Sequence, residues 1–185
     1  MHAMPLYFAF LRAINVGGHT VTMARLREVF ESLGFFKVET FIASGNVVFE
    51  ADETKTKALE TRIEKGLRDA LGYEVVTFIR TPSEVAAIAA YAPFPAEAMA
   101  QAKGVNVAFL RDEISAETTQ KLMGLKTEFD DFLAHGREVY WLCRTRQSDS
   151  KISNVLLEKS LGLRMTIRGE NTVKKMAAKW GEMSA

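Results

Sequence analysis

The fold of this 185-residue chain is decided by residues 6–50, LYFAFLRAINVGGHTVTMARLREVFESLGFFKVETFIASGNVVFE. The opening residues 6–14 are dense in large apolar side chains, which predicts a buried strand. Apolar side chains then recur at helical spacing over 23–34. Thr22 is placed to cap the start of that helix, and Gly34 follows its end. The stretch therefore begins with a strand, a loop and a helix.

The elements that follow complete a recognisable unit. Residues 37–43 and 46–50 predict two strands joined by a hairpin turn. Helical spacing predicts a helix over 56–72, and 74–80 predicts a further strand. The order is βαββαβ, which is the order of a ferredoxin-like unit.

The second half of the chain repeats this order of elements after a connector. Thr81 and Glu84 form a capping-box pattern that predicts a short helix to about Tyr91. Prolines and alanines over 92–104 predict the connector. The remaining elements are predicted as a strand at 105–110, a helix at 115–125, a hairpin at 130–145, a helix at 151–162, a strand at 163–169 and a helix at 171–180.

We therefore predict an α+β protein of two ferredoxin-like βαββαβ subdomains with antiparallel sheets. The first spans 1–91, the connector spans 92–104 and the second spans 105–185. Right-handed crossovers give each sheet the strand order 4-1-3-2 with both helices on one face. In such a sheet the loop after the first strand lies beside the hairpin after the second.

Composition limits the class of protein. Hydrophobic residues make up 48% of the chain and charged residues 25%, which is typical of a folded globular protein. The single cysteine, Cys143, cannot form an internal disulfide and fits a reducing compartment. The sequence has no run of 18 apolar residues and no signal-peptide pattern at its start. We expect a cytoplasmic location and no membrane partner.

A candidate site for a small anionic, phosphate-bearing ligand lies at the loops after strands one and two. Glycines let backbone N–H groups turn toward a ligand, and a helix N-terminus favours an anion. Arg25 stands in the first turn of the helix, where acidic residues are usual. A purely structural glycine turn is the alternative. The candidate residues are Arg12, Asn15, Gly17, Gly18, His19, Arg25, Ser44, Gly45 and Asn46.

The charge distribution suggests a second anion site. Residues 1–135 carry a net charge of −4 and residues 136–185 a net charge of +5, within a total of +1. Solvated surface charge is the alternative interpretation, with serine and threonine side chains acting as helix caps. The candidate residues, which the topology places at one end of the second sheet, are Arg144, Arg146, Ser150, Lys151, Arg168 and Thr172.

Whether the protein is an enzyme stays open. The sequence has no Gly-x-Ser-x-Gly elbow and no His-Glu-x-x-His motif, and its three histidines do not supply a zinc site. We therefore predict no metal and no cofactor. An enzyme acting on the anionic ligand, with His19 or Ser44 in the chemistry, is one alternative function. Cys143 is expected to be a buried, inert thiol.

A nucleic-acid or protein-interaction module that uses the basic second subdomain is the other alternative. A βαββαβ unit is also the order of the RNA recognition motif. The third strand of that motif carries a glycine followed by aromatic residues that stack on bases. Residues 44–49 keep the glycine but lack the two stacking rings, so this sequence does not favour single-stranded RNA.

Residues 11–50 resemble the opening of the domain-of-unknown-function family 1697. Its members typically have Leu-Arg-Gly-Ile-Asn-Val-Gly-Gly and later Ser-Gly-Asn-Val-Val-Phe. Here Ala13 replaces a usual glycine, and Gly169-Glu170 replaces a usual Asn-Trp. The resemblance implies a bacterial cytoplasmic protein with two α+β subdomains and brings no activity. It also implies that the family motifs contain Arg12, Asn15, Gly17, Gly18, Ser44, Gly45 and Asn46.

Overall fold

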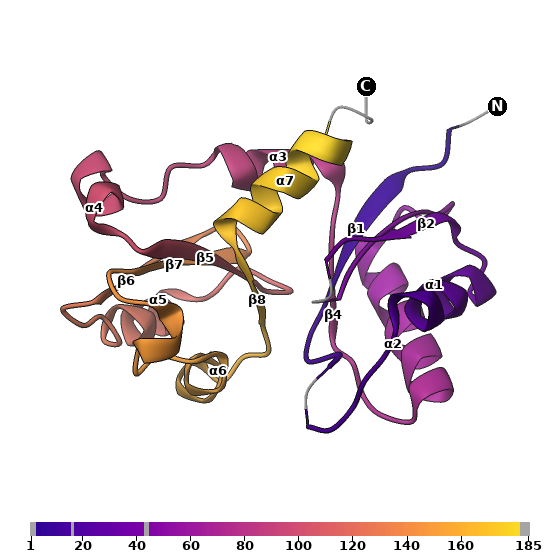
Figure 1. Cartoon of the computed structure of the whole chain (residues 1–185), viewed down its shortest axis with the longest axis horizontal. Coiled ribbons are helices and arrows are strands. Elements are labelled where there is room, and N and C mark those ends of the chain that lie inside the picture. Colours follow the sequence, from indigo (N-terminus) through magenta and orange to yellow (C-terminus); the bar gives the residue numbers. More distant parts are fainter. Residues whose placement is uncertain (1–2, 16, 43–44, 182–185) are drawn as a thin grey trace. The chain divides into compact units, whose positions relative to one another are not determined.

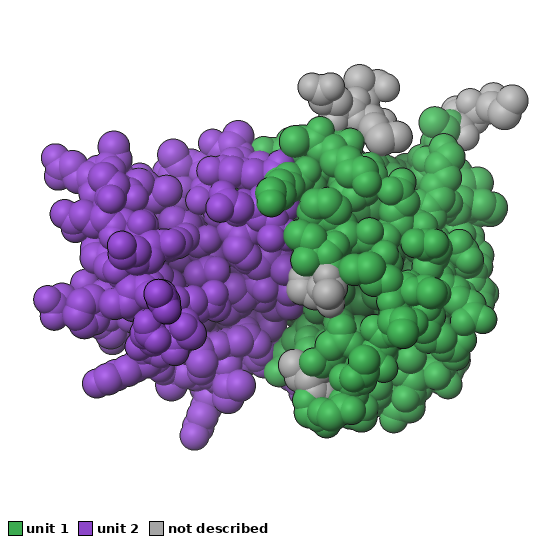
Figure 2. All heavy atoms as spheres, in the orientation of Figure 1, with its two compact units in different colours: residues 1–88, 175–185 green, residues 89–174 purple. Residues whose placement is uncertain are grey.

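The structure, a computed structural model, describes residues 3–15, 17–42 and 45–181. It contains two four-stranded antiparallel sheets with helices between their strands (Figure 1). The chain divides into two compact units, which Figure 2 distinguishes by colour. Unit 1 consists of Met1–Ile88 and Lys175–Ala185, and unit 2 of Ala89–Lys174. The prediction of an α+β fold with two βαββαβ-like subdomains is confirmed.

Unit 1 has its strands in the order β2-β3-β1-β4, which is the predicted order. All neighbouring strands in this sheet are antiparallel. Its elements are β1 (Leu6–Leu11), α1 (Met23–Ser32), β2 (Phe36–Thr40), β3 (Asn46–Glu50), α2 (Thr56–Leu71), β4 (Thr77–Arg80) and α3 (Pro82–Ala90).

Short-range sequence signals set the helix boundaries in this unit. The Thr22 side chain accepts a hydrogen bond of 3.1 Å from the Arg25 N–H and begins α1, as predicted. The predicted capping box is also present at α3: the Thr81 N–H donates to Glu84 Oε2 at 2.8 Å, and the Glu84 N–H donates back to Thr81 Oγ1 at 3.3 Å. Helices α1 and α3 therefore start where nearby side chains satisfy free N–H groups, whereas α2 follows Lys55 without a side-chain cap hydrogen bond.

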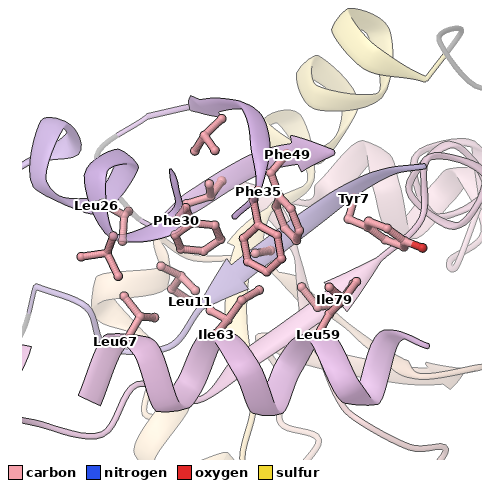
Figure 3. Packing of buried hydrophobic residues seen from close by; sticks show 14 of the residues in the cluster. Tyr7, Leu11, Leu26, Phe30, Phe35, Phe49, Leu59, Ile63, Leu67 and Ile79 are labelled. Atoms are coloured by element: carbon pink, nitrogen blue, oxygen red, sulfur yellow. The ribbon is translucent and has the colours of Figure 1, made fainter. Parts of the chain in front are cut away.

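The core of unit 1 lies between its sheet and the helices α1 and α2. Figure 3 shows Leu59, Ile63 and Leu67 of α2 pointing toward the strands, where they meet apolar side chains that include Phe49. Leu59, Ile63, Leu67 and Phe49 are all fully buried. Burial of one such side chain stabilises a fold by about 1.5–3 kcal/mol, so this layer holds the helices on the sheet.

The outer edge of β4 is covered by two carboxylates of α2. Glu60 Oε1 accepts from the Ile79 N–H at 3.1 Å, and Glu64 Oε1 accepts from the Thr77 N–H at 3.0 Å. Glu60 is only 3% exposed. An edge strand presents free N–H groups that invite pairing with another chain. Helix α2 therefore both packs on the sheet and closes this edge.

Unit 2 repeats the topology with its strands in the order β6-β7-β5-β8. A helix stands inside the segment predicted as a connector, because residues 96–101 fold as α4. The elements are α4 (Ala96–Gln101), β5 (Gly104–Phe109), α5 (Ala116–Met123), β6 (Asp130–His135), β7 (Glu138–Cys143), the 3-10 turn η1 (Gln147–Asp149), α6 (Asn154–Leu161), β8 (Thr166–Gly169) and α7 (Glu170–Trp180). Helix α7 begins in unit 2, and its residues from Lys175 onward belong to unit 1.

The alternative interpretation of Ser150 and Thr172 as the caps of two helices in unit 2 was wrong. Helix α6 begins at Asn154 and is capped by Ser153, whose side chain accepts from the Leu156 N–H at 3.1 Å, and not by Ser150. Helix α7 begins at Glu170, directly after β8, so Thr172 lies within its first turn. In both places several serine or threonine residues compete for the cap, and the path of the chain selects one of them.

A buried carboxylate explains the position of Ser150. Asp130, 2% exposed, accepts from Trp141 Nε1 at 2.9 Å and from Ser150 Oγ at 2.8 Å through Oδ1. Its other oxygen, Oδ2, accepts from Thr127 Oγ1 at 2.7 Å. Buried charges persist only when their hydrogen bonds are satisfied. The Ser150 hydroxyl thus takes part in an internal hydrogen-bond network that joins β6, β7 and the loop before α6.

The division of the chain differs from the sequence interpretation at its end. The sequence assigned 105–185 to one subdomain, whereas the structure groups Lys175–Ala185 with unit 1. In that unit Trp180 packs edge-on against Phe8 at 6.1 Å and against Phe41 at 5.4 Å between ring centroids. These aromatic contacts join residues far apart in sequence, and no local pattern signals them.

Candidate functional site

The end of β1 and the β2–β3 hairpin lie side by side in unit 1. The Leu11 N–H donates to the Gly45 carbonyl at 2.9 Å. Gly45 has a φ of +80°, and a Cβ there would come within 2.8 Å of Ile14 Cγ2. Only glycine fits a left-handed position with so close a neighbour. Gly45 therefore has a structural role that brings the two loops together.

Asn46 closes the hairpin and is fully buried. Its Nδ2 donates to the Phe41 carbonyl at 2.9 Å, and its own carbonyl accepts from the Phe41 N–H at 3.0 Å. The side chain is thus used within the turn. Ser44, the other predicted member of the hairpin, lies outside the described residues.

Gly17 and Gly18 present open backbone to the solvent. Both have left-handed φ angles, +65° and +83°, and a Cβ at either position would meet nothing within 4 Å. The loop that carries them is closed by Asn15, whose Oδ1 accepts from the Val21 N–H at 2.8 Å. Glycine suits these two positions because of their left-handed backbone conformation, since no neighbouring atom would crowd a larger side chain there.

His19 is held against the body of the unit by Tyr73. The two rings stack with centroids 3.9 Å apart and an angle of 20° between their planes. The Tyr73 hydroxyl donates to the Ile14 carbonyl at 2.9 Å, and burial raises the pKa of this phenol. The sequence analysis missed Tyr73, because it follows α2 and nothing near it in sequence points to the first loop.

Two arginines of the candidate set lie at this end of the unit. Arg25 is exposed in the first turn of α1, and its Nη1 pairs with Glu28 Oε2 at 2.8 Å. The first turn of α1 has no acidic residue, so the positive end of the helix is not neutralised there. Arg12 is half-buried, and its N–H donates to the Val76 carbonyl at 2.9 Å.

In the second candidate set, the side chain of Arg168 is buried within the protein. Arg168 is only 7% exposed. Its Nη1 donates to Thr166 Oγ1 at 2.7 Å and to the Ile167 carbonyl at 2.9 Å. Burial lowers the pKa of this guanidinium to about 10. Arg168 thus bonds within its own strand, which the sequence pattern did not indicate.

The other members of the second set differ in exposure. Arg146 and Lys151 are exposed, while Arg144 and Thr172 are half-buried. The Arg144 N–H donates to the Phe129 carbonyl at 2.8 Å, which extends the pairing beyond the ends of β6 and β7. Ser150 bonds to Asp130 as described. Exposed arginine and lysine are the ordinary composition of a protein surface.

Other chemistry in the described residues is limited. Cys143 is 1% exposed, and burial raises the pKa of its thiol to about 11, so the reactive thiolate is disfavoured. Within residues 3–15, 17–42 and 45–181, no three His, Cys, Asp or Glu side chains gather in a way that suits a metal ion. Nor does any helix in those ranges have the length and apolar character needed to cross a membrane.

Comparisons with known proteins agree with this architecture. A solved structure titled "The structure of conserved bacterial protein SP0830 from Streptococcus pneumoniae" is similar, with a TM-score of 0.73 and 23% sequence identity. The match covers 95% of this chain and 98% of that one, and it shows a shared fold. None of the curated proteins matches this sequence. The model of the family described as "Protein of unknown function (DUF1697)" matches residues 4–140, and the chain belongs to this family.

Proposed function

We propose that unit 1 binds a small anionic, phosphate-bearing ligand at the loop that joins β1 to α1. The observation that carries the proposal is the pair of exposed left-handed glycines, Gly17 and Gly18, with open space above both. A phosphate can approach a backbone that has no side chain in the way. The glycines stand shortly before α1, and a helix N-terminus favours negative charge.

The surrounding groups support an anion rather than a neutral ligand. Arg25 lies in the first turn of a helix that has no acidic residue there. Its Glu28 partner is exposed, and so is Arg25 itself. Exposed ion pairs are worth at most about 1 kcal/mol, so an anion displaces this pairing at little cost. His19 adds a ring held by Tyr73 at the edge of the same loop.

Titration calorimetry with inorganic pyrophosphate tests the charge. The variant Arg25→Ala is expected to weaken binding by about 1–3 kcal/mol, the range for hydrogen bonds to charged groups, with little change in stability. The matched control is Arg27→Ala, which removes another exposed arginine from the same helix. Equal affinity in the wild type and in both variants, or no binding to any of them, contradicts the proposal.

A second pair of variants separates the loop from general strain. Gly18 and Gly72 share a φ of +83° and have nothing within 4 Å of an added Cβ. Gly18→Ala and Gly72→Ala therefore impose comparable backbone strain, but only the first obstructs the approach of pyrophosphate. We expect loss of affinity with Gly18→Ala alone. The same affinity in both variants returns the loop to a purely structural role.

A further inference from the structure

A pocket of about 530 Å³ lies at the end of the unit 1 sheet away from the glycine loop. This volume falls in the range of pockets that hold small molecules, about 300–1,000 Å³. It forms where β1 begins and where β3 and β4 end. The residues around it are Ala3, Met4, Pro5, Leu6, Tyr7, Lys37, Glu50, Thr81, Pro82 and Ser83.

The pocket carries two opposite charges from neighbouring strands. Lys37 Nζ lies 2.9 Å from Glu50 Oε1. The lysine side chain is 72% exposed, whereas the glutamate side chain is only 15% exposed. The carboxylate is therefore the largely desolvated partner, and the ammonium is the solvent-exposed partner at the rim. An exposed lysine gives up such a pairing at little cost.

The backbone of β2 is distorted where Lys37 stands. Lys37 has a φ of +46°, and the register between β2 and β3 shifts between Phe36 and Glu39. An irregularity of this kind redirects a side chain at the edge of a sheet. A left-handed position is unfavourable for lysine and persists only when the surroundings hold it. The distortion places the ammonium beside Glu50.

Hydroxyl and apolar groups complete the wall. Thr81 Oγ1 and Ser83 Oγ lie 3.1 Å apart at the start of α3. Met4, Pro5, Leu6 and Pro82 supply apolar surface. The Tyr7 hydroxyl is already used, because it donates to the Glu53 carbonyl at 2.8 Å. Because Thr81 Oγ1 already accepts from the Glu84 N–H, a ligand meets one carboxylate, one ammonium, the Ser83 hydroxyl and an apolar surface.

We infer that this pocket binds a small zwitterion with an apolar side group, such as a free apolar amino acid. Its ammonium takes the place of Lys37 Nζ on Glu50. Its carboxylate then pairs with the released lysine, and the apolar group lies on the wall near Met4 and Leu6. A ligand with only a carboxylate draws Lys37 away and leaves the largely buried Glu50 without a partner, and a ligand with only an ammonium forgoes the pairing with Lys37. The inference is independent of the anion site proposed at the other end of the sheet.

The corresponding corner of unit 2 provides an internal comparison. A smaller pocket of about 300 Å³ lies there, between the start of β5, the end of β8 and the beginning of α7. Its glutamate, Glu170, pairs with Lys174 on its own helix at 3.0 Å. A hollow at this corner is thus present in both units. The larger volume and the cross-strand charge pair distinguish unit 1.

Calorimetric titration of the full chain with L-phenylalanine, two of its derivatives and glycine tests the inference. N-acetyl-L-phenylalanine lacks the ammonium, L-phenylalanine amide lacks the carboxylate, and glycine lacks the apolar group. We expect L-phenylalanine to bind about tenfold or more tightly than each of the three, because each loses one charged hydrogen bond or the buried ring. No binding of L-phenylalanine at about 10 mM, or equal binding of all four, overturns the inference.

Two variants assign the charges. Glu50→Gln is expected to abolish the preference for L-phenylalanine over its N-acetyl derivative, and Lys37→Met the preference over its amide. Lys65→Met is the matched control, since it removes a lysine from the exposed pair with Asp69 on α2. Each readout is a ratio of affinities within one variant, so a change in stability does not imitate it. Unchanged ratios in Glu50→Gln and Lys37→Met contradict the assignment.

Discussion

Several residues in the β1–α1 loop and in the neighbouring β2–β3 hairpin have left-handed backbone conformations. Ala13 has a φ of +56° and Ile42 a φ of +63°, in addition to the glycines already described. Both residues carry a Cβ, and for such residues the left-handed conformation costs about 1–2 kcal/mol each. Ala13 stands where the family resemblance places a usual glycine. The backbone at this position has a left-handed geometry that glycine adopts easily, so the alanine that replaces the usual glycine is strained.

Ala13→Gly is expected to stabilise the protein by about 0.5–1 kcal/mol, because glycine adopts the left-handed conformation without steric cost. The midpoint of urea unfolding measures the change. Ala87→Gly is the opposite control. Ala87 is an exposed residue in the middle of α3, where glycine destabilises a helix by about 0.5–1 kcal/mol. A shift of both variants in the same direction argues against strain at Ala13.

At the scale of elements, helix α2 covers one face of its sheet and closes the edge of β4. Its apolar side chains, such as Ile63, point into the core (Figure 3). Glu60 and Glu64 stand one turn apart on the same helix and accept N–H groups of alternate residues in β4. The spacing of four residues on a helix thus matches the spacing of two residues on a strand.

Glu60→Met removes the acceptor of the Ile79 N–H while keeping the length and helix propensity of the side chain. We expect a loss of about 1–3 kcal/mol in the free energy of unfolding, the cost of an unsatisfied buried donor. Lys65→Met on the same helix is expected to change it by less than about 0.5 kcal/mol. Chemical denaturation measures both, and equal stability of the two variants shows that the edge bond contributes nothing.

For the whole molecule, the two units share one topology, and the interior of unit 2 contains two buried titratable side chains, Cys143 and Tyr140. In unit 2, burial raises the pKa of the Cys143 thiol to about 11 and also raises the pKa of the Tyr140 phenol. A group whose pKa is higher in the folded state binds its proton more tightly there. It stabilises the fold fully below its unfolded pKa, and this contribution is lost as the pH rises toward the folded value.

The free energy of unfolding is therefore expected to fall as the pH rises from about 9 to 11, where Cys143 contributes about 2–3 kcal/mol of the loss. Cys143→Ala removes the thiol and flattens the curve between about pH 9 and 10, whereas above about pH 10, the ordinary pKa of a tyrosine, Tyr140 still contributes in both proteins. Urea unfolding at a series of pH values, with both proteins compared by circular dichroism, provides the measurement. Parallel curves for the two proteins contradict the buried-thiol explanation.

The order of the elements and of the strands was predictable from the sequence. Periodicity indicated the type of most elements, and right-handed crossovers left few ways to pair four strands. Caps such as Thr22 and the Thr81–Glu84 box marked helix starts, because each acts within three residues. The proximity of Gly45 to the end of β1 followed from the strand order. These properties rest on interactions that are local or that topology alone implies.

The sequence by itself thus determined a pair of βαββαβ units and the place of the glycine loop. Only the tertiary structure decided that Arg168 turns into its strand, that Ser150 bonds to Asp130 and that Tyr73 holds His19. It also decided that Lys37 and Glu50 face one pocket. Ser150, Tyr73 and Lys37 depend on partners distant in sequence, and Arg168 depends on the packing that buries its side chain. A side chain's direction is set by the packing around it, which periodicity does not encode.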